Sequence, residues 1–519
     1  MVKKFRYDDV PTVQTKAGKL KGYSFDDMYI FKGIPYAEAK RFQMPTPVTP
    51  WEGVREATSY GLVAPLLTRD TPTGELLVPH RYWPQDENCL NLNVWTESLD
   101  THAKKPVMVW LHGGGYSAGS SIEQIAYDGF NMSRHGDVVV VSVNHRLNIL
   151  GYMDLSPFGE KYKNSGNAGH ADLVAALQWV NENIANFGGD PENITIFGQS
   201  GGGMKVTGLM QIPSANGLFH KAIVMSGVSD GKLLSPGKGD GTKIVHALLE
   251  ELKIPKNEIE KLETVSYHDL ARAYNKVSPP IAQEGGYVGC APIKDDFYMG
   301  EPLINGYTEH AKTIPLMVGS VYGEFSFAPL SFNKQELTDE EMRTIVAEKF
   351  GERSDEMIDL FIKAYPDKKI VDLLSLDRVF RIPTKALAQL HATDGKAPAY
   401  LYNFTLDFPY EHGKTAWHCA DIPFVFHNTD KVEVCNIPGV SDKLEKQVFN
   451  AFVGFARNGH PNHDGLPNWP AVTIDNEPTM IFDRNCEVRN NYDHALFALF
   501  EEALPPFSLA ELFQQDIQH

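Results

Sequence analysis

Short apolar runs alternate with segments of helical periodicity through the first half of the chain. Five of these runs are continuously apolar and lie at residues 107–111, 138–141, 194–197, 222–225 and 314–318. Continuous rather than alternating apolar runs are typical of parallel strands that are covered on both faces. Between the second and third run, residues 173–184 repeat large apolar side chains at helical spacing. The pattern predicts an α/β fold with a central, mostly parallel twisted sheet and helices on both faces.

Two long stretches interrupt this alternation. Residues 228–312 open with glycine- and serine-rich turns and continue in polar helical patterns, and a second helical block covers about 335–395. A length of 519 residues permits several domains of about 100–200 residues each. Because the chain has no repeat, low-complexity tract or flexible linker, we interpret both stretches as helical insertions in one domain that spans residues 1–519.

Composition and charge narrow the class of partner. Hydrophobic residues make up 42% and charged residues 22% of the chain, as in ordinary globular proteins. With 48 basic and 66 acidic side chains, the net charge is −18. This charge argues against nucleic acids and anionic membranes, which are bound by clustered lysine and arginine. No run approaches the about 20 apolar residues that span a bilayer, and no apolar segment follows the basic N-terminus. We expect a small-molecule substrate and neither a nucleic-acid nor a membrane partner.

The cysteines indicate a reducing environment. There are five, widely spaced and without a Cys-x-x-Cys pair. An odd number at such spacing favours neither a disulfide framework nor a zinc site. We expect a cytoplasmic protein, a monomer or a homodimer, without a metal.

The most informative segment is the Gly-x-Ser-x-Gly pattern at residues 198–202, which directly follows a predicted strand. A serine on a sharp turn from strand to helix has a strained backbone, and side chains two positions before and after it would collide with neighbouring elements. The pattern therefore makes Ser200 a candidate nucleophile. The alternative is an ordinary glycine-rich helix start.

A serine nucleophile needs preplaced donors for the oxyanion that its attack creates. The sequence His-Gly-Gly-Gly-Tyr at residues 112–116 also follows a predicted strand, and glycines let backbone N–H groups point into a site. In this architecture the loop acts together with the N–H of the residue after the nucleophile, here Gly201. A phosphate-binding turn is the alternative, but the spacing of a dinucleotide motif is absent.

The acid and the base should follow in the order serine, acid, histidine. Glu324 lies just after the apolar run at 314–318, at the edge of the sheet where sites form in α/β proteins. Many other carboxylates are available, and position alone favours Glu324 only weakly. His412 and His418 both follow a predicted strand at 400–404, and spacing does not choose between them.

At this point several blocks resemble a known family, the type-B carboxylesterases, which include the cholinesterases. The matching blocks include Phe-Lys-Gly-Ile-Pro-Tyr-Ala at residues 31–37, Glu-Asn-Cys-Leu at 87–90, Asn-His-Arg-Leu at 144–147, Phe-Gly-Gly-Asp-Pro at 187–191 and Phe-Ala-Arg-Asn-Gly at 455–459. The similarity is strongest over residues 175–203 and extends over roughly residues 11–485. Together the blocks are highly specific.

The resemblance implies an α/β-hydrolase fold and a serine carboxylesterase that forms a covalent acyl-enzyme. Carried onto the matching motifs, the family's site residues are Ser200 as nucleophile, Glu324 as acid, His418 as base, Gly114, Gly115 and Gly201 as oxyanion donors, and Ser226 as a serine that steadies the acid. The family also suggests two structural ion pairs, Arg41 with Glu87 and Arg146 with Asp172. No cofactor is needed. An ordinary histidine base would lose activity near its pKa of about 6.5.

The chain departs from the family pattern beside the proposed catalytic residues. Gln199 stands where glutamate is usual, so one negative charge is missing. Gly201 replaces a common alanine, which we expect to keep the N–H donor and loosen the turn. Cys419 replaces a common glycine after the histidine, and its simplest role is that of a small packing side chain. Tyr116 and Phe325 adjoin proposed catalytic groups, and we expect them to line an apolar substrate pocket.

Other functions fit the same motifs less well. A catalytically inactive, cholinesterase-like binding protein usually lacks a member of the triad, whereas Ser200, Glu324 and His418 are all present. A lipase would need an apolar lid, and the insertion at 228–312 has a polar pattern. An amidase or peptidase could use the same three residues. The pattern does not identify the ester that is hydrolysed.

Overall fold

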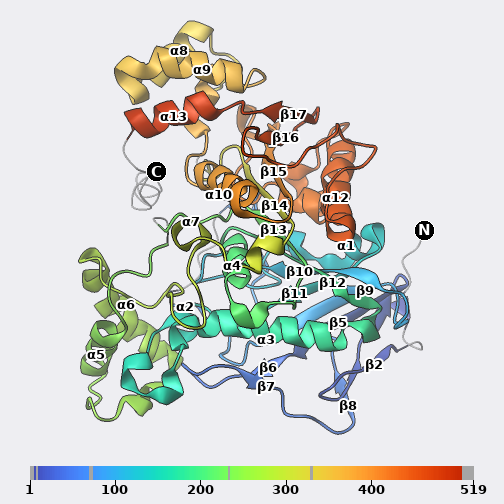
Figure 1. Ribbon diagram of the computed structural model, residues 1–519, viewed down its shortest axis with the longest axis vertical. Helices are drawn as coiled ribbons and strands as arrows, with labels where there is room; N and C mark the ends of the chain where they lie inside the picture. Colours follow the sequence, from blue (N-terminus) through green and yellow to red (C-terminus); the bar gives the residue numbers. More distant parts are fainter. Residues whose placement is uncertain (1–4, 7–9, 69–73, 232–233, 328–330, 505–519) are drawn as a thin grey trace.

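A large mixed sheet forms the centre of the molecule (Figure 1). The computed structural model describes residues 5–6, 10–68, 74–231, 234–327 and 331–504. In sheet order, the 12 strands are β1 (Phe5–Arg6), β4 (Tyr23–Phe25), β5 (Met28–Pro35), β9 (Asn91–Thr96), β11 (Val139–Val143), β10 (Lys105–Leu111), β12 (Gly189–Gln199), β13 (Lys221–Met225), β14 (Leu316–Val321), β15 (Ala399–Phe404), β16 (Pro478–Phe482) and β17 (Glu487–Asn490). Small separate sheets pair β2 (Thr12–Gln14), β3 (Lys19–Lys21) and β8 (Val54–Glu56), and β6 (Ala37–Glu38) with β7 (Thr46–Pro47).

The middle of the sheet is parallel and its margins are antiparallel. From β11 to β16 every neighbouring pair is parallel, and each of the five predicted strands lies within or overlaps a strand of this region. The strands β1, β4, β5 and β9 on one side and β17 on the other pair in antiparallel fashion. The chain crosses over between parallel strands, so their carboxyl ends, where the candidate residues follow, share one edge of the sheet.

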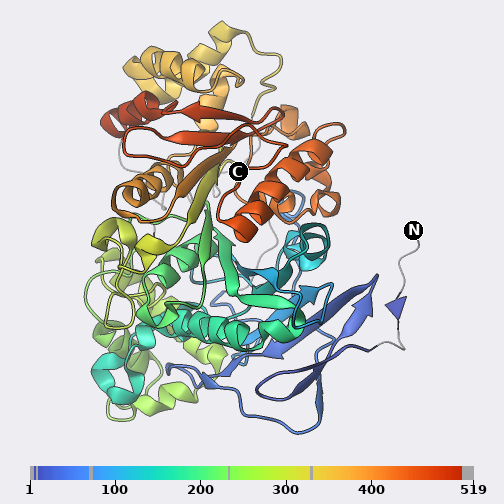
Figure 2. The ribbon, with the colours of Figure 1, turned by 45° about the vertical axis from the view of Figure 1, so that its right-hand side comes forward.

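The helices cover both faces of the sheet, as Figures 1 and 2 show. Their bounds are α1 (Gly129–Gly136), α2 (Asn148–Tyr152), α3 (Ala168–Asn183), α4 (Gly201–Met210), α5 (Thr242–Glu251), α6 (Tyr267–Gln283), α7 (Pro302–Asn305), α8 (Asp339–Phe350), α9 (Ser354–Ala364), α10 (Arg381–Asp394), α11 (Ile422–Val425), α12 (Ser441–Asn458) and α13 (His494–Ala503). The predicted helix at 173–184 corresponds to α3.

Alternate side chains of each central strand enter two different hydrophobic cores. In β10, Val107 and Val109 pack into the core that includes residues of α3 and α4, whereas Met108 and Trp110 pack into the core that includes residues of α1 and α12. Because both faces are buried, both sets of positions favour apolar side chains. This is why the strands read as continuous apolar runs in the sequence.

The two stretches that we interpreted as insertions contain helices between sheet strands. The helices α5, α6 and α7 lie between β13 and β14, and α8, α9 and α10 lie between β14 and β15. In Figure 1, α5 and α6 lie at the lower left of the molecule, and α8, α9 and α13 lie at its top. Among the described helices, none combines the length and the apolar character that crossing a bilayer requires.

Both ion pairs that the family resemblance suggested are present. Arg146 donates to Asp172 at 2.7 Å, and both side chains are almost fully buried. Arg41 donates to Glu87 from its Nε atom at 2.8 Å. Breaking a buried pair such as Arg146 with Asp172 costs about 3–5 kcal/mol. Glu87 is 36% exposed, so its pair with Arg41 contributes less.

Candidate active site

Ser200 occupies the turn between β12 and α4. The strand ends at Gln199 and the helix begins at Gly201. The backbone of Ser200 has a φ of 59° and a ψ of −128°, a conformation that costs a non-glycine residue about 1–3 kcal/mol. Its N–H donates to the carbonyl of Met225 at 2.9 Å, which ties the turn to β13. The strained turn places the serine at the carboxyl edge of the parallel strands.

The glycines on either side of Ser200 are required by close backbone contacts. A Cβ atom at Gly202 would lie 2.0 Å from the carbonyl oxygen of Leu111, at the end of β10. A Cβ atom at Gly198 would lie 2.5 Å from the carbonyl carbon of Gly202. Both distances are far below ordinary contact, so the Gly-x-Ser-x-Gly pattern here has the steric cause that the sequence suggested.

The glycine run after β10 lies directly against the serine turn. Gly114 and Gly115 have positive φ values of 83° and 61°, which favour glycine. A Cβ atom at Gly201 would lie 2.1 Å from the carbonyl oxygen of Gly115. Glycine at 201, which we expected to loosen the turn, also allows this loop to approach. In the described chain, the N–H groups of Gly114, Gly115 and Gly201 donate to no loop carbonyl or side chain.

The structure brings Glu324 and His418 together. Glu324 follows β14 and is fully buried, and its Oε2 atom lies 2.5 Å from Nδ1 of His418. Its other carboxylate oxygen accepts from the Val321 N–H at 3.0 Å. The carbonyl of Glu324 also accepts from the His418 N–H at 2.6 Å. His412, the alternative that spacing left open, is exposed and lies in the short 3-10 turn Tyr410–His412.

Ser226 lies at the end of β13, where its backbone has a φ of 45° and its N–H donates to the carbonyl of Gly319 at 2.8 Å. Its hydroxyl acts to lower the pKa of Glu324 without completing a hydrogen bond of standard geometry. Burial has the larger effect and raises the pKa of Glu324. Ser226 is therefore placed to favour the ionised form of this acid.

His418 is largely buried, with 8% of its surface exposed, and acidic groups surround it. Burial lowers the pKa of His418, and Asp421 and Asp377 oppose this effect. Burial, together with the charge of Glu324, raises the pKa of both Asp377 and Asp421 to about 7. Sequence reasoning assigned no role to these two aspartates. Asp421 follows the histidine by three positions and could have been found, but Asp377 comes from the insertion before α10 and gives no local signal.

Aromatic rings flank the histidine. The ring of Phe325 lies 5.1 Å from that of His418 at 26°, and the ring of Phe380 lies 5.5 Å away at 8°. Such offset stacking favours one ring orientation. Tyr116 is only 2% exposed and packs against Tyr152 and His170. Phe325 is partly exposed and so has the better claim to contact a substrate; Phe380 was not anticipated.

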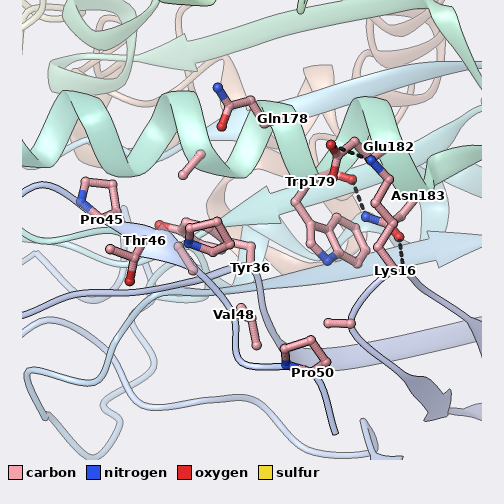
Figure 3. Close-up of a pocket in the computed structure, with 14 residues that line it drawn as sticks. Lys16, Tyr36, Pro45, Thr46, Val48, Pro50, Gln178, Trp179, Glu182 and Asn183 are labelled. Atoms are coloured by element: carbon pink, nitrogen blue, oxygen red, sulfur yellow. Dashed lines mark hydrogen bonds and ion pairs between the residues drawn. The ribbon is translucent and has the colours of Figure 1, made fainter.

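The pocket in Figure 3 lies elsewhere. It encloses about 350 Å³ between α3 and the segment from Tyr36 to Pro50, with Trp179 and Tyr36 on its walls. Lys16 and Glu182 form an ion pair of 2.6 Å at its rim. None of the candidate catalytic residues lines it, so it is separate from the chemistry described above.

One cluster in the described chain has the spacing of metal ligands. Glu477, Asp493 and His494 bring ligand atoms within 4.8 Å of one another. The Lys385 ammonium group already lies 2.5 Å from Asp493 and 3.4 Å from Glu477. A cation of the protein therefore fills this position, and the cluster is better explained as an ion-pair network.

The sheet topology, the serine turn and the buried acid–histidine pair define an α/β-hydrolase. The sequence model of the carboxylesterase family matches residues 9–499, and the chain belongs to this family. Relatives include the para-nitrobenzyl esterase of Bacillus subtilis (strain 168), 33% identical over 92% of this chain and 96% of that protein. The phenmedipham hydrolase of Pseudarthrobacter oxydans is 31% identical over 92% of this chain and 96% of that protein.

Among solved structures, an esterase from the anaerobe Clostridium hathewayi, which can hydrolyze aliphatic aromatic polyesters, is 60% identical. The match covers 97% of this chain and all of that one, with a TM-score of 0.95. A thermophilic para-nitrobenzyl esterase is 31% identical over 94% of this chain and 99% of that one, with a TM-score of 0.76. These findings make the protein a carboxylic ester hydrolase.

Proposed function

We propose that this esterase hydrolyses its substrate in two steps through Ser200, His418 and Glu324. In the first step, neutral His418 accepts the hydroxyl proton of Ser200 as the serine oxygen attacks the ester carbonyl. Glu324 accepts a hydrogen bond from Nδ1 of His418 and stabilises the imidazolium. The single observation that carries this proposal is the buried hydrogen bond of 2.5 Å between Glu324 and His418.

The N–H groups of Gly114, Gly115 and Gly201 would stabilise the tetrahedral oxyanion. The imidazolium of His418 then gives its proton to the alkoxy oxygen, the ester bond breaks and the alcohol leaves. In the second step, a water molecule gives its proton to His418 and attacks the acyl-enzyme, and the acid is released as Ser200 regains a proton. Removing one oxyanion donor typically reduces kcat by about 10²–10³-fold.

We infer that the preferred acyl group is aromatic. The ring of Phe325, which stacks on His418 and is partly exposed, offers an apolar surface against which an aromatic acyl group can stack. The likeness to an esterase that can hydrolyze aliphatic aromatic polyesters supports the same class. Small dissolved esters with an aromatic acyl group are the proposed substrates.

A panel of p-nitrophenyl esters tests both points. We expect the wild type to hydrolyse the panel and Ser200→Ala to lose activity by several orders of magnitude. A fluorophosphonate probe should label the wild type but not Ser200→Ala. Labelling or turnover that survives in the variant would contradict Ser200 as the nucleophile. A benzoate turned over no faster than a butyrate would contradict the aromatic preference.

We also propose a cytoplasmic enzyme that is a monomer or a homodimer and needs no cofactor. All five cysteines are free thiols in the structure, which suits a reducing compartment. Light scattering of the purified protein would measure the oligomeric state. Full activity after treatment with a chelator would support the absence of a metal.

A further inference from the structure

The side chain of Gln199 lies on the ring of His418. The amide nitrogen Nε2 is 3.2 Å from Nε2 and 3.3 Å from Nδ1 of the histidine. A position in the ring plane equally near both nitrogens would bring the amide nitrogen into collision with the ring carbon between them. The amide nitrogen therefore lies out of that plane, toward the face of the ring. The amide therefore restricts the tilt of the imidazole, whereas Glu324 fixes the direction of Nδ1.

Cys419 holds the other end of this amide. Its Sγ atom donates to Oε1 of Gln199 at 3.3 Å and accepts from Nε2 of Gln124 at 3.6 Å. Gln199 is fully buried, Gln124 is 6% exposed and Cys419 is partly exposed, so these bonds lie at the edge of the protein interior. The thiol thus selects one of the two orientations of the Gln199 amide, the one with nitrogen toward His418.

The backbone at Cys419 carries a conformational cost. Its φ is 79°, in the left-handed region that favours glycine. A side chain that persists in such a conformation beside a reactive group points to a role for that side chain. The oxyanion loop adjoins the same amide, because a Cβ atom at Gly113 would lie 3.4 Å from Oε1 of Gln199.

We propose that Cys419 is a positioning residue for His418, which acts by orienting the amide of Gln199. The proposal rests on the function proposed above, in which His418 is the base. The NH₂ group of Gln199 lies against the ring and carries partial positive charge. It therefore disfavours the protonated, positively charged form of His418. The charged groups that also face this histidine are Glu324, Asp377 and Asp421.

The first test removes the thiol. Cys419→Ala should lower kcat about 3- to 10-fold, the effect of losing one neutral hydrogen bond, with KM changed by less than about twofold because no substrate contact is lost. Cys419→Ser retains a donor and should restore most of kcat. Cys486→Ala is the matched control, since its Sγ atom also donates to a glutamine Oε1, that of Gln447 at 3.4 Å, and Gln447 has no hydrogen bond to the proposed triad.

The second test changes the charge over the ring. Gln199→Glu should stabilise the imidazolium and move the acid limb of the kcat/KM profile to higher pH by about one unit or more. Gln199→Leu removes the amide and should resemble Cys419→Ala. This pair keeps the test valid if Cys419→Ala does not fold, because neither variant changes the strained backbone at 419.

The outcomes separate the two proposals. If Ser200→Ala remains active, the proposed function fails. If Ser200→Ala is inactive but Cys419→Ala matches Cys486→Ala in kcat, KM and pH profile, only the positioning role of Cys419 is overturned. Failure of Cys419→Ser to recover activity, with Gln199→Glu leaving the acid limb in place, would overturn it as well.

Discussion

At the scale of single residues, the proposed base differs from a histidine in water. Burial lowers the pKa of His418 to about 4, whereas the ordinary value is about 6.5. The neutral ring is the reactive form, so activity is lost only as the pH falls through the lowered pKa. We expect kcat/KM to persist below pH 6 and to fall toward pH 4, measured with an ester that is stable in acid. Half-maximal activity at pH 6.5 or above would contradict this prediction.

The sequence predicts those residues of the candidate site that belong to a local motif of fixed spacing. The pattern predicted Ser200 because a strained turn leaves room only for glycine two positions before and after the serine. In the structure, a Cβ atom at Gly202 would lie 2.0 Å from the carbonyl oxygen of Leu111. Spacing could not separate His418 from His412, and only the family resemblance did so. Phe380 and Asp377 reach the histidine from an insertion, so their place depends on tertiary packing that no local pattern encodes.

At the scale of elements, glycines inside helices differ in whether the surrounding structure leaves room for a Cβ atom. Gly202→Ala should destabilise the protein by about 1–3 kcal/mol or more, because the added Cβ atom would meet the Leu111 carbonyl at 2.0 Å. Gly454→Ala, inside α12, should stabilise it by about 0.5–1 kcal/mol, because its nearest neighbour would lie at 3.8 Å. Thermal unfolding of both variants measures the contrast. Shifts of the same sign would contradict it.

The strands differ in how clearly the sequence predicts them. The five parallel strands from β10 to β14 are mainly apolar on both faces and were found from that pattern. The strand β9 is fully buried but contains Asn91, Asn93 and Thr96, and its polar side chains are satisfied internally, as where Asn93 donates to Ser142 at 3.0 Å. A buried strand that carries such groups has no apolar run to reveal it.

At the scale of the whole molecule, buried charge joins the second helical stretch, which contains α10, to the segment that leads into α13. Asp493, just before α13, accepts from Arg381 at 2.8 Å and from Lys385 at 2.5 Å, both on α10. The sequence shows all three residues but not their meeting, since more than 100 residues separate them. Composition narrowed the class of partner, whereas this contact required the folded structure.

The ion pairs of Asp493 stabilise the folded protein less as the pH falls. Burial alone would raise the pKa of Asp493, but Arg381 and Lys385 lower it to about 2, below the unfolded value of about 3.9. The folded state therefore binds fewer protons than the unfolded state between these values, and the stabilisation is present above pH 4 and is lost as the pH falls toward 2. Asp493→Asn should lower stability by about 3–5 kcal/mol at pH 7.

Thermal unfolding of wild type and Asp493→Asn between pH 7 and pH 3 tests this assignment. The difference in Tm should be constant above pH 4 and should narrow below it, because a protonated aspartate and an asparagine then carry the same charge. Asp475→Asn is the control, since Asp475 is exposed and should give no such difference at any pH. A difference that stays constant down to pH 3 would mean that Asp493 does not gain its stability from ionisation, and that packing rather than charge joins α10 to the C-terminal helix.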